Sequence, residues 1–484
     1  TYGTRNFAPG SELWAFMPPE FYGRIQRLYE NTVAVRLPPP ADNTGRQAKD
    51  YGMDGPITAF SGQVGGEPKK FIYATMRRGG RVVYAFDVTS PENPTLAWRR
   101  GCPNLTNDTD CSPGFEQIGQ TWSSVKTLTA AGYGSGTAPL VVMGGGYDNC
   151  EDTDSATTAA GITTYRNHSC TTTSKGNRIY VMDAANGTLV RTFTTDRPVV
   201  ADLTIVNGPD GRALYAYAAD MGGNVYRVSF TGTSSTAWSI RKIAALGCDT
   251  PALTGCSTAT APRKFMFAPG VVTADSGTTY NILLGSGDRE KPVRTYLATQ
   301  SVQNYFFMLR DRPGDTGWFD SEATVTGCGV TNSLLCMNSL TPITPGVKPT
   351  DAALSSKKGW YLALSSTEQV VTSALTLFGV TTFSTSQPPV VSTTTCAANL
   401  GTTRVYNINY LNAFSATNEA LPYATVVGGG LPPSPVGGLV LLGPNNLVPF
   451  CIGCSAASPL ESRRAGSLSN VTKPIGRSYW YLKQ

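Results

Sequence analysis

The chain has 484 residues, of which 40% are hydrophobic and only 15% are charged, and it contains 51 glycines and 33 prolines. This mix disfavours long helices, which need more helix-forming residues, and it disfavours disorder, which needs fewer aromatic and β-branched residues. The net charge of +6 comes from scattered lysines and arginines, and the absence of a basic stripe with interleaved aromatics argues against a nucleic-acid partner.

The first 50 residues predict a lead-in segment that packs on the rest of the chain. Residues 11–17 (SELWAFM) predict an apolar strand that ends at Pro18. Residues 19–29 (PEFYGRIQRLY) favour a short helix, because proline is well tolerated in a first helical turn. The stretch LPPPADNTG, residues 37–45, is typical of an extended polar linker.

From residue 51 to residue 484 the pattern is strands and turns. One unit recurs, in which an alternating apolar strand is followed by a polar turn and a return strand. Its copies are residues 82–98, 179–193, 225–238, 305–319 and 404–421, with further apolar runs at 139–148, 280–288, 359–365, 370–385 and 435–443. Such repeats predict an all-β chain folded as a β-propeller, whose blades need neighbours to bury their faces. A pair of β-sandwiches is the alternative.

Eleven cysteines indicate an oxidising compartment, where disulfides staple polar loops. The predicted pairs are close in sequence: Cys102 with Cys111, Cys150 with Cys170, Cys248 with Cys256, Cys328 with Cys336, and Cys451 with Cys454. Cys396 is left over, and its pairing with either of the last two stays open. A zinc site is disfavoured, because the chain has one CxxC and one histidine.

Catalytic motifs are missing from the sequence. His168 is the only histidine, and it lies in the polar loop between Cys150 and Cys170, which predicts a bystander. The sequence therefore has no Ser-His-Asp triad and no HExxH zinc motif. The stretches GGGYDN and GGGLPPSPVGG predict turns, since neither follows a strand and opens a helix as a phosphate site requires.

The stretch DNCEDTDS, residues 148–155, carries four carboxylates within seven positions. Calcium prefers several such oxygens together with backbone carbonyls. The candidate metal ligands are Asp148, Glu151, Asp152 and Asp154. The alternative is a solvated acidic loop beside a disulfide.

A second candidate for calcium lies in DLTIVNGPDGRALYAYAADMGGNVYRV, residues 202–228. A short calcium loop places its carboxylates at alternating positions so that they converge on the ion. Asn207 and Asp210 have the wrong spacing for this, and Leu214 stands where a closing carboxylate would be. Taken alone, the stretch predicts a β-hairpin.

Several long motifs, ordered along residues 10–484, resemble the C-terminal domain of the PilY/PilC family of type IV pilus tip-associated biogenesis proteins and adhesins. They are GSELWAFMPPEFY (10–22), YGMDGPITAF (51–60), RRGGRVVYAFDVTSPENP (77–94), MGGGYDNCEDTDS (143–155), KGNRIYVMDAANGTLV (175–190), residues 202–228, GWYLALSSTEQVVTSAL (359–375) and GRSYWYLKQ (476–484).

The resemblance implies a modified propeller of about seven blades, related to quinoprotein-like propellers. It also implies a non-enzymatic, extracellular protein that reaches the pilus tip after periplasmic export, docks minor pilins and supports pilus biogenesis, twitching motility and cell adhesion to host or abiotic surfaces. Larger family members carry an N-terminal von Willebrand A-like region, so we expect this chain to be a C-terminal portion or a processed form.

The resemblance also implies calcium as a cofactor. The family's calcium loop precedes the strand that here is YAYAAD. Asn207 falls near its first ligand position, Asp210 falls near the aspartate before its glycine, and Leu214 replaces its last aspartate. Because a carboxylate is lost and the spacing changes, we expect weak calcium binding here.

Two alternative functions belong to other classes: a quinoprotein-like periplasmic dehydrogenase, and a carbohydrate-binding propeller whose loop aromatics stack on sugars. Against the dehydrogenase, this sequence lacks the acidic and amide residues that would hold a calcium-bound quinone. No stretch of the sequence approaches the about 18 apolar residues of a membrane span.

Overall fold

The computed structural model describes residues 8–35, 49–159, 161–249, 261–325, 333–389, 399–417, 419–441 and 447–455. Within these ranges the chain is mostly strand and loop, and its strands form five sheets of at least four strands and two sheets of two strands. Each larger sheet is called a blade below, numbered in chain order.

The first three blades are antiparallel sheets of four strands. Blade 1 contains β1 (Ile57–Val64), β2 (Glu67–Ala74), β3 (Arg81–Asp87) and β4 (Thr95–Cys102). Blade 2 contains β5 (Lys126–Leu128), β6 (Leu140–Gly144), β9 (Arg178–Asp183) and β10 (Leu189–Thr194). Blade 3 contains β11 (Thr204–Asn207), β12 (Ala213–Ala219), β13 (Asn224–Ser229) and β14 (Ser239–Ala245).

Blades 4 and 5 have five strands each. Blade 4 has the order β15 (Gly270–Ala274), β16 (Thr279–Gly285), β17 (Tyr305–Asp311), β19 (Gly359–Ala363) and β18 (Thr341–Ile343), and β18 runs parallel to β19. Blade 5 contains β20 (Gln369–Val370), β22 (Val380–Gln387), β23 (Thr402–Asn409) and β24 (Tyr423–Val426), with β21 (Leu375–Leu377) also paired to β22.

Two hairpins and several short helices complete the described chain. The hairpins are β7 (Ser155–Ala159) with β8 (Ile162–Arg166), and β25 (Val436–Leu441) with β26 (Leu447–Ile452). The α-helices are α1 (Ile25–Glu30), α2 (Leu297–Gln300) and α3 (Asp351–Ser355). The 3₁₀ turns are η1 (Pro19–Arg24), η2 (Arg77–Gly79), η3 (Gly134–Gly136), η4 (Asn149–Glu151), η5 (Ser235–Ala237), η7 (Asp275–Gly277), η8 (Asp320–Thr324) and η9 (Met337–Ser339).

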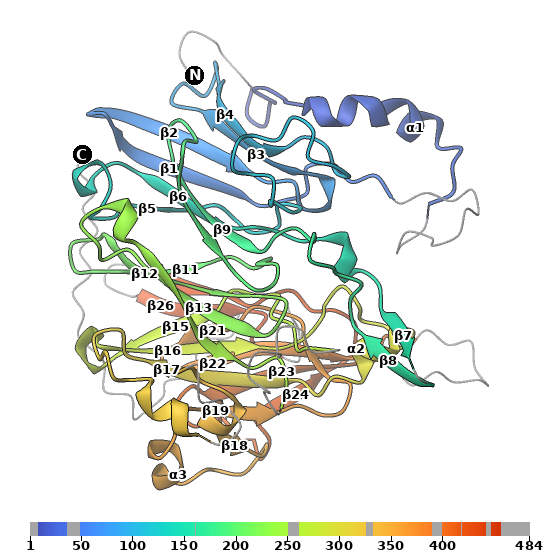
Figure 1. The fold of residues 1–484 in the computed structure, drawn as a ribbon, viewed down its shortest axis with the longest axis vertical. Helices are drawn as coiled ribbons and strands as arrows, with labels where there is room; N and C mark the ends of the chain where they lie inside the picture. Colours follow the sequence, from blue (N-terminus) through green and yellow to red (C-terminus); the bar gives the residue numbers. More distant parts are fainter. Residues whose placement is uncertain are drawn as a thin grey trace.

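Neighbouring blades pack face to face through shared apolar clusters, so the blades follow one another in chain order (Figure 1). The paired sets are Phe71 and Val83 with Val141 and Tyr180, Val142 and Val181 with Ala216 and Val228, Tyr217 and Ile243 with Ile282 and Phe307, and Leu283 and Phe306 with Phe383 and Tyr406. Strands near the start of successive blades also touch, β11 with β15 and β15 with β21. This blade-on-blade burial is what a propeller needs for stability, and the predicted all-β propeller is confirmed.

Two of the five predicted strand–turn–strand units, 82–98 and 179–193, contain both of their paired strands, β3–β4 and β9–β10. In the units at 225–238 and 404–421 the first strand is present, and the strand that pairs with it, β14 or β24, begins just after the unit ends. The unit predicted at residues 305–319 is wrong, because β17 pairs with β19 and not with the segment that follows it. Trp318 caps that blade instead, and its indole Nε1 donates to the carbonyl oxygen of Arg310 at 3.0 Å. Where about seven blades were predicted, the described residues supply five blades and the β25–β26 pair.

The lead-in segment packs on blade 1. The strand predicted at residues 11–17 is wrong, since these residues form loop, whereas the predicted short helix is present as η1 and α1. The Phe16 ring lies 5.2 Å from that of Tyr84 and 4.9 Å from that of Phe86, and Arg24 donates to the carbonyl oxygen of Tyr51 at 2.8 Å. The domain boundary at residue 50 stays a prediction.

A long insertion separates β6 from β9 in blade 2. Residues 145–177, called the insertion arm below, carry η4 and the β7–β8 hairpin, which stands out from the blades beside α2 (Figure 1). A disulfide between Cys150 and Cys170 closes the base of the arm.

Candidate functional site

The four carboxylates of the insertion arm lie at its base. Asp148 caps η4, where its Oδ1 accepts from the backbone N–H of Cys150 at 2.8 Å. Its Oδ2 accepts from the backbone N–H of Lys175 at 2.6 Å. Asp148 therefore ties the two ends of the arm together.

Glu151 is fully buried and is paired with two cations from the segments that join blade 2 to blade 3 and blade 3 to blade 4. Its carboxylate contacts the guanidinium of Arg197 and lies 2.8 Å from Nζ of Lys264. Nζ of Lys264 also donates to Asp288 at 2.7 Å. Burial alone would raise the pKa of Glu151, but Lys264 and Arg197 together lower it to about 2.

Asp152 and Asp154 extend these contacts outward. Asp152 accepts from both terminal nitrogens of Arg78, at 2.7 and 3.1 Å, and from the Tyr147 hydroxyl at 2.8 Å. Asp154 lies 3.0 Å from Nζ of Lys291 and accepts from the backbone N–H of Ala298 in α2 at 2.8 Å. Carboxylates of the arm are thus bonded to blade 1, blade 4 and α2.

The alternative of a solvated acidic loop is wrong for this stretch, since Glu151 is 0% and Asp152 is 8% exposed. Calcium binding by these four carboxylates stays a prediction. An ion would have to displace the protein's own cations or amide donors, which already occupy the oxygens of each carboxylate.

His168 belongs to the same buried network and is no bystander. Its Nδ1 accepts from the backbone N–H of Cys170 at 3.1 Å, and its Nε2 lies 3.1 Å from Nη1 of Arg197. Burial, together with the Arg197 charge, lowers the pKa of His168 to about 4. The imidazole is therefore neutral at pH 7.

Sequence reasoning missed the cations of this network. Arg78, Arg197, Lys264 and Lys291 come from four separate segments. A weak signal was available at Lys264, which follows Arg263 and directly precedes the apolar residues FMF, because a lysine that such a run draws into the interior is buried only when it is paired.

The second calcium candidate is an exposed turn. Asn207 is the last residue of β11, and Leu214 lies in β12. Asp210 accepts from the backbone N–H of Arg212 at 3.1 Å, its carboxylate lies 3.5 Å from the Arg212 guanidinium, and its side chain is 56% exposed. The predicted hairpin is confirmed, and weak calcium binding there stays a prediction.

Three of the predicted disulfides are confirmed: Cys102–Cys111, Cys150–Cys170 and Cys451–Cys454. Cys248 and Cys336 are also disulfide-bonded. Their predicted partners Cys256 and Cys328, and the unassigned Cys396, lie outside the described residues.

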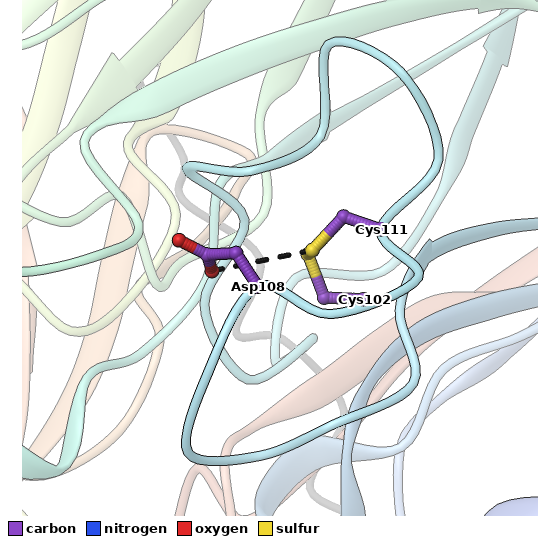
Figure 2. A group of neighbouring side chains, drawn as sticks. All are labelled: Cys102, Asp108 and Cys111. Atoms are coloured by element: carbon purple, nitrogen blue, oxygen red, sulfur yellow. Dashed lines mark hydrogen bonds between the residues drawn. A yellow bond between two sulfur atoms is a disulfide. The ribbon is translucent and has the colours of Figure 1, made fainter.

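Figure 2 shows the Asp108 carboxylate facing the Cys102–Cys111 disulfide, with 4.0 Å between its Oδ1 and Sγ of Cys111. Oxidised sulfurs offer no thiolate to a metal, so this cluster does not have the donors of a metal site. The carboxylate pairs instead with Lys175 at 2.7 Å and with Arg81 at 2.9 Å, and these bonds lower the pKa of Asp108.

A cavity of about 590 Å³ opens where the blades meet, and it is called the funnel below. Many of its lining residues lie just before the first strand of a blade or hairpin, so one end of several blades contributes to it. The lining includes Tyr51, Asp54, Arg77, Arg78, Trp122, Asp202, Phe267, Arg289, Glu290, Ser373 and Ser434. Its volume lies in the range of small-ligand sites.

Aromatic rings and guanidinium groups meet at one wall of the funnel. The Trp122 ring stacks on the buried Tyr147 ring with 4.5 Å between centroids. The guanidinium carbons of Arg77 and Arg78 lie 5.6 and 5.2 Å from the Trp122 centroid, within the distance of a cation–π contact. Arg78 is held by Asp152 and by Glu290, each at 2.7 Å.

The fold and the site define a class of protein: a disulfide-stapled β-propeller with a rigidly anchored insertion arm and a funnel where its blades meet. The chain belongs to the PilY1 β-propeller domain family, whose model matches residues 16–316. The family predicted from the sequence motifs is thereby confirmed.

One curated relative is the type IV pilus biogenesis factor PilY1 of Pseudomonas aeruginosa (strain UCBPP-PA14). It is 25% identical over 239 residues, which cover 47% of this chain and 16% of that protein. The match therefore spans about a sixth of the relative's length. Among the described residues, no helix has both the length and the apolar character to cross a membrane.

Solved structures support the fold. The crystal structure of the Pseudomonas aeruginosa PilY1 C-terminal domain matches with a TM-score of 0.57 and 14% identity, covering 92% of this chain and 87% of that one. A quinohemoprotein alcohol dehydrogenase from Pseudomonas putida HK5 reaches a TM-score of only 0.38 at 10% identity, covering 85% of this chain and 56% of that one. The second likeness is too low to say anything about chemistry.

Proposed function

We propose that this chain is a non-enzymatic module of the type IV pilus tip that supports pilus biogenesis and twitching motility, docks minor pilins and contributes to attachment to host or abiotic surfaces. The observation that carries the proposal is the family match over residues 16–316. The curated relative in that family is named as a type IV pilus biogenesis factor. An extracellular location at the pilus tip, after periplasmic export, is part of the proposal.

The architecture is suited to such a role. Packed blades hold loops in fixed positions, and binding residues are often found on loops of a rigid scaffold. The insertion arm is anchored by a disulfide and by buried ion pairs, so its β7–β8 hairpin can meet a partner with little loss of entropy. We propose residues 51–484 as the propeller and residues 1–50 as its lead-in segment.

The test is to delete the gene region that encodes this chain and to follow surface pili, twitching and the minor pilins in sheared pili. We expect fewer pili, reduced twitching and co-purification of the restored chain with minor pilins in the sheared fraction. Normal pili and motility without the chain, together with its absence from sheared pili, would contradict the proposal. Dye reduction by the purified chain, supplied with a quinone and an alcohol or sugar, would contradict its non-enzymatic part.

A further inference from the structure

The funnel holds a guanidinium group that forms no ion pair within the described residues. Arg77 is exposed, and among the described residues its side chain makes no hydrogen bond or ion pair, only its contact with the Trp122 ring. Its backbone φ is 44°, a left-handed conformation that a non-glycine residue adopts at a cost. The chain thus holds Arg77 at the funnel wall despite local strain.

A second guanidinium lines the same cavity. Arg289 is fixed by one nitrogen, since its Nη1 donates to the carbonyl oxygens of Val371 at 2.6 Å and Pro432 at 3.3 Å. Its Nε and Nη2 make no hydrogen bond within the described part of the chain. Burial lowers the pKa of Arg289, the Glu290 carboxylate opposes this, and the positive charge of Arg77 adds to the lowering. An anion between the two cations would relieve that repulsion.

The charged groups of the lining sum to zero, since three arginines face three carboxylates: Arg77, Arg78 and Arg289 with Asp54, Asp202 and Glu290. Arg78 is shared by Glu290 and Asp152, and Asp202 is paired with Lys126 at 2.8 Å. The unpaired lining groups are Arg77, Arg289 and the Asp54 carboxyl, which give two positive charges and one negative charge. This balance fits one carboxylate better than a doubly charged phosphate.

The remaining lining suits a hydroxylated ring. The half-buried Trp122 and Phe267 offer apolar surface, and Ser373, Ser434 and Asp54 offer groups that exchange hydrogen bonds with hydroxyls. A few polar groups set among aromatic walls are typical of small-ligand sites.

We propose that the funnel binds a sugar that carries one carboxylate, such as a hexuronate unit of an acidic polysaccharide. Arg77 and Arg289 would hold the carboxylate, since guanidinium forks match its geometry, and the aromatic wall would face the apolar side of the sugar ring. The choice of a polysaccharide unit as the natural ligand rests on the proposed role in surface attachment.

The test is calorimetry on the purified chain with D-glucuronate as the probe, D-glucose as the uncharged analogue and glutarate as a carboxylate without a sugar ring. We expect saturable binding of glucuronate, about tenfold weaker or absent with glucose and glutarate, and weakened at least about tenfold in Arg77→Gln, because a charge-assisted hydrogen bond is lost. The matched control is Arg166→Gln, which changes an exposed arginine of β8 outside the funnel and should leave binding unchanged.

A second variant separates loss of binding from loss of folding. Arg77→Gly removes the guanidinium and relieves the strain at φ 44°, so it should abolish glucuronate binding without lowering the thermal midpoint. The inference is overturned if glucuronate gives no saturable heat, if glucose or glutarate binds as well, or if Arg77→Gln binds as the unchanged chain does. Because the assay needs no pili, failure of pilus association with intact glucuronate binding would reject only the proposed function, and the reverse result would reject only this inference.

Discussion

The insertion arm and the β11–β12 turn both carry carboxylates, but only the arm buries them. Glu151 is inaccessible and faces two cations from the segments that join successive blades, whereas Asp210 is 56% exposed and, among the described residues, pairs with Arg212, two residues away. The difference teaches that a carboxylate's role is decided by the groups that the fold brings to it. In the arm, the charges link segments that are distant in the sequence. In the turn, they lie at the surface and contribute little to stability.

The largest expected effect comes from removing Lys264, the cation that pairs with Glu151 of the arm and with Asp288. Lys264→Met leaves Glu151 and Asp288 buried with fewer partners, and breaking such a pair costs about 3–5 kcal/mol in the free energy of unfolding. Urea unfolding measures this loss. The matched control is Lys242→Met, which breaks a partly exposed pair with Asp196 and should cost below about 1 kcal/mol. Equal losses of unfolding free energy in the two variants would contradict the claim that buried ion pairs matter more than surface pairs.

The covalent closure of the arm gives the next effect. Replacing Cys150 and Cys170 by serine opens a loop with a sequence separation of 20, and the chain-entropy estimate for such a loop is about 3 kcal/mol. Chemical unfolding of the double variant under oxidising conditions tests this value. Serine replacement of Cys451 and Cys454, separated by 3 residues, is the control and should cost about 2 kcal/mol. A larger loss in the control would contradict the loop-length argument.

The buried network also predicts that the free energy of unfolding depends on pH. The pKa of His168 is lowered to about 4 in the folded chain, so between pH about 6.5 and 4 only the unfolded chain binds the proton. Stability therefore falls as the pH drops through this window, by about 2–3 kcal/mol after allowance for screening. Thermal midpoints from pH 7 to 4 should show the fall.

His168→Asn keeps an acceptor for the N–H of Cys170 and removes the titrating group. In this variant the thermal midpoint should fall much less between pH about 6.5 and 4. Below pH about 4.5 a further loss follows in both chains as Glu151, whose pKa is about 2, is driven toward protonation. An equally steep fall of the thermal midpoint in the variant would show that another group is responsible.

The smallest effect is expected at the turn. Asp210→Ala should change the unfolding free energy by less than about 0.5 kcal/mol, as is usual for exposed positions. Calorimetry at micromolar to millimolar calcium should show no saturable binding that depends on Asp210. Binding lost in Asp210→Ala would prove this wrong, and binding lost instead in Asp152→Ala would place the ion at the arm.

Local patterns predicted the fold well wherever strands that pair are adjacent in sequence. The alternation at residues 82–98 and 179–193 marks β3–β4 and β9–β10, which are joined by short turns. Residues 305–319 show the same pattern, but the partner of β17 is β19, which begins only at Gly359. No local signal distinguishes a strand that pairs with the next strand in the sequence from one that pairs with a strand far along the chain.

Only part of the site could be predicted from the sequence, because local patterns do not show which distant residues the fold brings together. The acidic stretch at residues 148–154 stood out, whereas its partners Lys264 and Lys291 lie more than a hundred residues away. The funnel gave no signal, because several segments contribute only one or a few residues each, such as Arg77 and Arg289. A site assembled from dispersed residues becomes visible only when the blades are placed side by side.

The disulfide at the base of the arm determines how the chain would carry mechanical tension. A pull on the two ends of blade 2 passes from Cys150 to Cys170 through the sulfur–sulfur bond, so the β7–β8 hairpin bears none of it. With about 3.3–3.6 Å per extended residue, the bond withholds about 70 Å of contour length from stretching. The hairpin therefore keeps its shape under load until the bond is reduced.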